Sequence, residues 1–141
     1  MSGLYDQDFA LWAAEQAALL RAGQLSAIDA AHLAEEIESV GASERREARN
    51  RLARLLQHLL KWHLQPGFRS RSWSVTIQTQ RDELAAVLDD SLSLRRTLPE
   101  LLPRAFQLGR NWATQETGLL NLPQECPWTV DQAMSNEFLP D

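Results

Sequence analysis

Three polar residues in this sequence have the chemistry of an acid–base or metal site and fall where a helical protein would place apolar side chains. Glu36 lies on the apolar face of one predicted helix, His58 flanks Leu55, and Glu116 continues the line of Trp112. Inward-facing stripes are normally apolar, because an unpaired polar group in a core costs free energy. Helical bundles build hydrolytic and metal centres from such inward carboxylates and imidazoles. One hypothesis is therefore an enzyme or metal site made of Glu36, His58 and Glu116.

A closed structural network is the competing interpretation of these polar residues. An acid such as Glu36 or Glu116 that pairs with Arg81, Lys61 or a tryptophan N–H would fix the helix register and catalyse nothing. We favour this interpretation, because purely structural networks also contain perturbed charges. The residues assigned to a binding site or buried polar network are Glu35, Lys61, Trp62, Trp73, Thr76, Gln80 and Arg81.

The groups that would hold a metal or act as a nucleophile are few. His32-x-x-Glu35 has the spacing of a di-iron bundle, but that site needs two such pairs and the chain has three histidines and one pair. Ser70 and Ser72 beside the Pro-Gly turn are typical helix caps, and no G-x-S-x-G motif is present. Cys126 has no basic neighbour that would activate its thiol. We predict no metal, no cofactor and no confident catalytic residue.

A basic segment on an acidic chain offers a third hypothesis, a nucleic-acid-associated protein. The net charge is −5, but residues 45–81 contain nine Lys/Arg against Glu47 alone, which gives +8 there and −13 elsewhere. Clustered arginines bind phosphates, and a neighbouring tryptophan stacks on bases. The acidic pI near 5.2 and the lack of a recognised nucleic-acid motif count against a dedicated binder. The arginines of this hypothesis are Arg45, Arg46, Arg49, Arg69 and Arg71.

Length and composition predict one domain and a cytoplasmic location. A chain of 141 residues with 44% hydrophobic residues buries a core without disulfides or metals. Its single cysteine suits a reducing compartment, since it excludes an intramolecular disulfide. No apolar run approaches a membrane span, and the first residues lack an export signal, so we predict no membrane contact.

Hydrophobic periodicity predicts an all-α fold, an antiparallel bundle of about five helices with a short irregular C-terminal tail. Stretches of alternating polarity that would indicate a sheet are missing from the sequence. Most helix ends are marked by caps, glycine or Pro-Gly. The predicted helices run from Asp6 or Asp8 to Gly23, from Ser26 or Asp29 to Gly41, from Ser43 to Pro66, from Ser70 or Ser72 to about Ser91, and from Thr97 to Gly118.

Two tetrapeptides have the pattern of a helix start. Thr97-Leu98-Pro99-Glu100 is typical of a capping box and predicts the beginning of the fifth helix. Thr129-Val130-Asp131-Gln132 predicts a short final turn within the proline-punctuated tail. In the earlier helices we expect Phe9, Leu20, Ile37 and Val40 to belong to inward apolar stripes.

Several sequence blocks follow one another over nearly the whole chain. The blocks are Leu4-Tyr5-Asp6-Gln7-Asp8-Phe9 with Trp12, Leu33 to Glu38, Leu56 to Trp62, Ser72 to Arg81, Asp90 to Leu94, Glu116 to Leu119 and Pro123 to Trp128. In this order they resemble a bacterial family called domain of unknown function 29. That resemblance implies a compact helical fold but no activity. It points to Glu35, Glu36, Glu38, His58, Lys61, Trp62, Trp73, Thr76, Gln80, Arg81 and Glu116 as the family pattern.

Our leading hypothesis is a small interaction or regulatory module with a protein partner. In it, the acidic second helix and the basic third helix pack together, and the remaining surface binds the partner. The nucleic-acid hypothesis is second, and the enzyme centred on Glu36, His58 and Glu116 is third.

Overall fold

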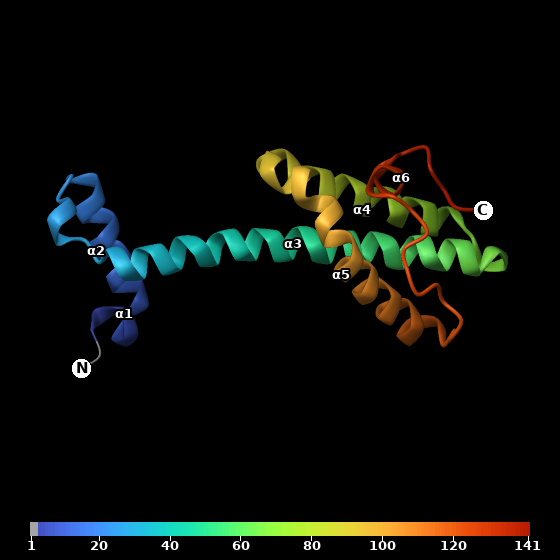
Figure 1. The fold of residues 1–141 in the computed structure, drawn as a ribbon, viewed down its shortest axis with the longest axis horizontal. Helices are drawn as coiled ribbons and strands as arrows, with labels where there is room; N and C mark the ends of the chain where they lie inside the picture. Colours follow the sequence, from blue (N-terminus) through green and yellow to red (C-terminus); the bar gives the residue numbers. More distant parts are fainter. Residues whose placement is uncertain (1–2) are drawn as a thin grey trace. The chain divides into compact units, whose positions relative to one another are not determined.

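The computed structural model describes residues 3–141, which form α-helices and short 3-10 turns and contain no strand (Figure 1). The all-α helical-bundle class is thereby confirmed. Among these residues, none of the helices is long and apolar enough to cross a membrane. The elements are α1 (Leu4–Gln7), α2 (Phe9–Arg21), η1 (Leu25–Ala27), α3 (Ala30–Leu64), η2 (Pro66–Phe68), α4 (Arg71–Asp90), α5 (Leu92–Thr117) and α6 (Val130–Met134).

The chain divides into two compact units, with the boundary between residues 42 and 43 inside α3. We call residues 3–42 the N-terminal unit and residues 43–141 the C-terminal unit. The prediction of a single domain, made from length, stays a prediction.

The N-terminal unit contains α1, α2, η1 and the first turns of α3. Its second helix begins and ends as its sequence predicts: Asp8 caps it by accepting a hydrogen bond from the Leu11 N–H (3.1 Å), and Gly23 follows it with φ +71°. Of residues 3–42, the buried ones are Trp12 and Gln16. This unit is therefore held together with almost no apolar core.

The C-terminal unit contains the apolar core. After the turn at η2, α4 runs back along α3, and α5 crosses α3 (Figure 1). At that crossing, a Cβ on Gly109 would lie 2.5 Å from the Ala53 carbonyl oxygen, so only glycine permits the close approach. The core residues include Leu52, Leu55, Leu56, Leu59, Leu60, Ile77, Leu84, Leu88, Leu98, Ala105, Phe106 and Ala133.

The predicted break at Gly41 is wrong, because α3 runs without interruption from Ala30 to Leu64. An exposed glycine inside a helix costs only about 1 kcal/mol relative to alanine, and the residues around it are good helix formers. The predicted acidic and basic helices are therefore successive turns of one helix and do not pack together. Ile37 and Val40, which we expected to face inward, are 71% and 63% exposed.

The predicted start of the fifth helix at Thr97 is also wrong. Helix α5 begins at Leu92, and the Thr97 hydroxyl donates to the carbonyls of Ser93 and Leu94 within the helix. A threonine side chain can bond to the preceding turn as well as to a helix start. The buried Leu94 and Leu98, one turn apart, extend the inward face and carry the helix past the expected cap.

Other predicted boundaries are confirmed by their cap geometry. Ser70 accepts a hydrogen bond from the Trp73 N–H (3.2 Å) at the start of α4, and Pro66 opens the η2 turn that ends α3. Gly118 ends α5 with φ +74°. Thr129 and Gln132 form a complete capping box at the start of α6.

Candidate functional site

Glu116 and Lys61, both singled out from the sequence, meet across α3 and α5. The Lys61 ammonium donates to Glu116 Oε1 (2.7 Å), and the Gln57 amide donates to Glu116 Oε2 (2.8 Å). The same Lys61 nitrogen lies 4.7 Å from the centre of the Trp73 ring on α4, a cation–π contact. Arg54 extends the chain of bonds by donating to the side-chain amide oxygen Oε1 of Gln57 (3.0 Å). These residues form a connected polar network on the C-terminal unit.

The electrostatics of this network keep its acid ionised and its histidine neutral. Partial burial of Glu116 would raise its pKa, but the hydrogen bonds from Lys61 and Gln57 outweigh burial and hold the pKa below its usual value. Burial lowers the pKa of His58, and the positive charges of Lys61 and Arg54 lower it further, against the opposing effect of Glu116. At neutral pH the imidazole is therefore an uncharged group beside a fixed ion pair.

An open hollow of about 640 Å³ lies over this network. One wall is the Trp112 ring, with the Arg54 guanidinium 4.1 Å from its centre. Lys61 and Gln57 each bond one carboxylate oxygen of Glu116, and the neutral His58 imidazole adds a ring nitrogen that can accept a proton. Glu36, the third residue of the enzyme hypothesis, is not among the lining residues, which are Arg54, Gln57, His58, Trp112, Gln115 and Glu116.

The remaining predicted site residues of the C-terminal unit have separate roles. Thr76 donates to the Ser72 carbonyl of its own helix (3.0 Å). The Arg69 guanidinium lies over the Trp62 ring, 5.2 Å from the ring centre. Gln80 lines a different hollow. Arg81 bonds to backbone carbonyls of the C-terminal segment.

Aromatic rings and carboxylates hold the N-terminal unit together. The Tyr5 hydroxyl donates to Glu36, and the Tyr5 ring stacks on His32 with 3.9 Å between centres. Asp29 accepts a hydrogen bond from the Trp12 indole N–H (3.1 Å) and lies 2.7 Å from His32 Nδ1. Tyr5 and Asp29 were not predicted as site residues, although Asp29-x-x-His32 has the same i, i+3 spacing as His32-x-x-Glu35. Glu35 itself is exposed.

Each titratable group of this aromatic cluster responds to its hydrogen-bond partner. The bond to Glu36 raises the pKa of Tyr5 to about 12. The bond between Asp29 and His32 lowers the pKa of the carboxyl and raises that of the imidazole. Among residues 3–141, no three His, Cys, Asp or Glu side chains come together in a way that could hold a metal ion.

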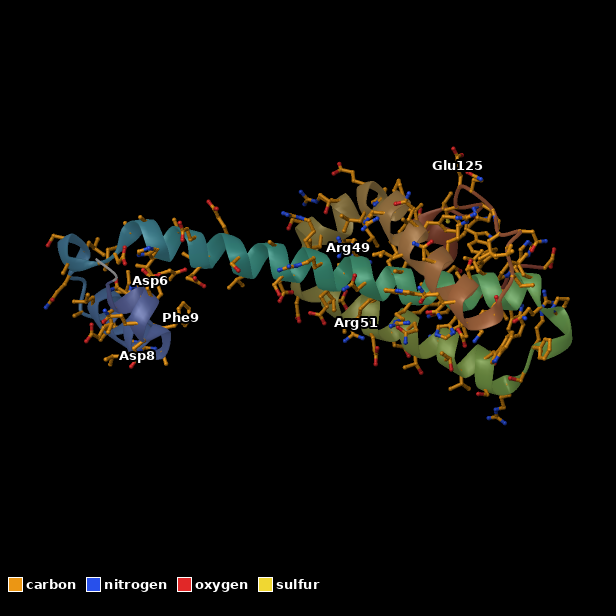
Figure 2. The ribbon with its side chains drawn as sticks, turned by 90° about the horizontal axis from the view of Figure 1, so that it is seen from below. Asp6, Asp8, Phe9, Arg49, Arg51 and Glu125 are labelled. Carbon is orange, nitrogen blue, oxygen red and sulfur yellow. The ribbon has the colours of Figure 1, made fainter. Side chains whose placement is uncertain are left out.

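Exposed apolar side chains are frequent in the N-terminal unit. Figure 2 shows Phe9 with Asp6 and Asp8 where α1 joins α2. Residues 3–42 also contain seven Asp/Glu and one Arg. The surface of the unit is therefore both apolar and acidic. Its large exposed apolar residues are Phe9, Leu11, Leu20, Leu25, Ile37 and Val40.

The basic segment is largely engaged within the C-terminal unit. Arg51 pairs with Glu47 (3.4 Å) and with Glu83 of α4. Arg69 donates to the carbonyls of Trp62 (2.8 Å) and Pro140 (3.4 Å). Arg49 and Arg51 project from α3 (Figure 2), and three arginines gather at a hollow of about 560 Å³. The arginines lining it are Arg46, Arg51 and Arg54.

Comparison with known proteins gives a family without an activity. The family model described as "Domain of unknown function DUF29" matches residues 4–139, nearly the whole chain. No curated protein and no solved structure matches the chain significantly.

Proposed function

This chain belongs to the DUF29 family, which has no assigned activity, and we propose that it is a protein-interaction module whose N-terminal unit binds a basic amphipathic helix of another protein. The observation that carries the proposal is the contrast within residues 3–42: two buried residues against six large, exposed apolar ones. A unit of about 40 residues rarely buries enough surface to be stable by itself. A partner that covers the apolar side chains would supply the missing burial.

Helix α3 offers the most regular part of this surface. Ile37 and Val40, three residues apart, lie on one face of the helix one turn after Leu33. Apolar side chains at this helical spacing form a continuous face against which the apolar face of a partner helix can pack. Both side chains are mostly exposed, so their burial would contribute to binding rather than to the fold.

The acidic charge of the N-terminal unit favours a basic partner helix. With seven acids and one arginine in residues 3–42, a second acidic surface would be repelled and a basic one attracted. The bonds of Asp29 to Trp12 and His32, and of Glu36 to Tyr5, preorganise the aromatic cluster, which reduces the entropy lost on binding. We place the interaction in the cytoplasm, since the single Cys126 is compatible with a reducing compartment.

The test compares two double variants in affinity capture from the host lysate with nuclease present. Ile37→Ser/Val40→Ser removes exposed apolar side chains from the N-terminal unit. Leu92→Ser/Leu120→Ser is the matched control, since it removes two apolar side chains of the C-terminal unit that are also more than half exposed. We expect a stoichiometric partner that survives nuclease, is lost with the first variant and is kept with the second. A synthetic peptide of its basic helix should then bind the wild type directly in calorimetry.

Two outcomes would contradict the proposal. A partner retained by Ile37→Ser/Val40→Ser would place the interface elsewhere. Material lost on nuclease treatment would favour the basic segment and nucleic acid instead. Light scattering of the purified chain distinguishes a second copy from a foreign partner, because only self-association raises the mass of the isolated protein.

A further inference from the structure

A buried guanidinium without a counter-ion lies on α4 of the C-terminal unit. Arg81 is 3% exposed, and it donates through Nε to the Ala133 carbonyl and through Nη2 to the Phe138 carbonyl, both at 2.7 Å. Within residues 3–141, no carboxylate lies within the 4.0 Å of an ion pair with Arg81. A buried cation is normally paired with an anion, because carbonyl dipoles compensate its lost hydration only in part.

Part of this guanidinium makes no hydrogen bond. Arginine carries five N–H donors, of which the two carbonyls take two, through Nε and Nη2. Among the described residues, the only buried side-chain nitrogen or oxygen without a partner is Nε of Arg110, so Nη1 of Arg81, which makes no hydrogen bond, keeps some contact with solvent. Arg81 lines a cavity of about 300 Å³, which is at the small end of ligand pockets.

The walls of this cavity combine polar and apolar groups. Gln78 Nε2 donates to Asn136 Oδ1 (3.0 Å), and Asn136 lines the cavity. The Asp82 carboxylate accepts from the same Gln78 nitrogen (2.9 Å) and is held at that side chain. The other walls are Ser74 and the apolar Val75, Ile77 and Leu139.

We propose that this cavity binds a small organic carboxylate. Its two oxygens would accept from Arg81 and Asn136, and a short apolar body would contact Val75 and Leu139. Charge-assisted hydrogen bonds to a planar guanidinium are the strongest that a carboxylate makes in proteins. Because Arg81 also holds the carbonyls of Ala133 and Phe138, ligand binding would stabilise the C-terminal segment. The site is independent of the partner surface on the N-terminal unit.

The experiment is a titration of the full chain with butyrate at constant ionic strength, followed by calorimetry and by the NMR signal of the Arg81 Nε–H. The control ligands are butyramide, which has the same shape without the charge, and inorganic phosphate, which has the charge without the apolar body. We expect butyrate to bind about tenfold or more tightly than butyramide, since one charged hydrogen bond accounts for such a factor. Weaker binding of phosphate would identify the apolar wall as part of the site.

Variants decide whether the cavity is the site. Arg81→Gln also frees the C-terminal segment, so Asn136→Leu and Ser74→Leu are the principal tests, because they fill the cavity and leave both carbonyl bonds of Arg81 in place. Each should weaken butyrate binding by about tenfold or more, while Asn121→Leu, an exposed change elsewhere, should have no effect. Equal affinity for butyrate and butyramide, or unchanged binding by both cavity-filling variants, would overturn the proposal.

Discussion

The two units of this chain are stabilised by different physical means. The C-terminal unit has a continuous apolar core that includes Leu56, Leu59 and Phe106, each at most 2% exposed. The N-terminal unit depends instead on stacked rings and on the bonds that Asp29 and Glu36 accept from Trp12 and Tyr5. The contrast shows that helix content does not by itself determine stability. Both units are helical, but only the C-terminal unit buries enough apolar surface to be stable by itself.

The difference also separates the candidate functions. The polar hollow of the C-terminal unit has its acid, Glu116, engaged by Lys61 and Gln57, as in a structural network. The N-terminal unit leaves apolar groups such as Ile37 and Val40 exposed, as in a binding surface. The next three experiments test this division.

The largest effect should come from the same truncation made once in each unit. Phe106 is 2% exposed and Phe9 is 49% exposed. Phe106→Ala should lower the free energy of unfolding of the C-terminal unit by about 3–5 kcal/mol, because it leaves a cavity in the core. Phe9→Ala removes only its ring contacts with Tyr5 and Trp12 and should cost about 1 kcal/mol in the N-terminal unit. Denaturant titration monitored by amide hydrogen exchange in α2 and α5 measures both, and equal losses would contradict the division.

A smaller effect of opposite sign is expected at two helical glycines. Gly109→Ala should destabilise the C-terminal unit by about 1–3 kcal/mol, because the added methyl group meets the Ala53 carbonyl. Gly41→Ala should stabilise α3 by about 0.5–1 kcal/mol, since Gly41 is helical and has nothing within 4 Å of an added Cβ. Thermal unfolding of the two variants gives both signs. Destabilisation by Gly41→Ala would mean that the helix ends there after all.

The smallest effect is a pH dependence with opposite direction in the two units. Burial lowers the pKa of His58, so the unfolded chain takes up the proton first, and the C-terminal unit loses stability as pH falls below about 6.5. The bond to Asp29 raises the pKa of His32, so its contribution to the N-terminal unit is complete below about 6.5 and is lost as pH rises through the folded value. His32 is partly exposed, and solvent screening keeps its contribution small.

Hydrogen exchange at about pH 5.5 and about pH 7.5, corrected for intrinsic rates, checks this dependence on each unit. Protection in α2 should be greater at the lower pH, and protection in α4 and α5 should be greater at the higher pH. His32→Gln should remove the first trend alone, and His58→Gln the second alone. Parallel trends in both units would show that these two histidines do not control the response.

Local signals in the sequence determined much of the fold. The caps at Asp8, Ser70 and Thr129 and the left-handed glycines Gly23 and Gly118 act within one turn, so residue type is sufficient to locate them. The buried stripe from Leu52 to Leu59 follows from the helical period. Where these signals failed, at Gly41 and Thr97, helix formation in the neighbouring turns outweighed a residue that also occurs at helix ends.

The partners of the polar residues were decided only by tertiary structure. The sequence placed Glu116 among the inward polar residues and offered Lys61 as one possible partner for a buried acid. The α3–α5 crossing at Gly109 brings these two together with Gln57. The sequence held one signal that Gln57 joins this network: it lies four residues before Lys61, on the same face of the helix. Periodicity says which side of a helix a residue occupies, and packing decides what it meets there. The exposure of Ile37 and Val40 and the uncompensated charge of Arg81 were beyond the sequence for the same reason.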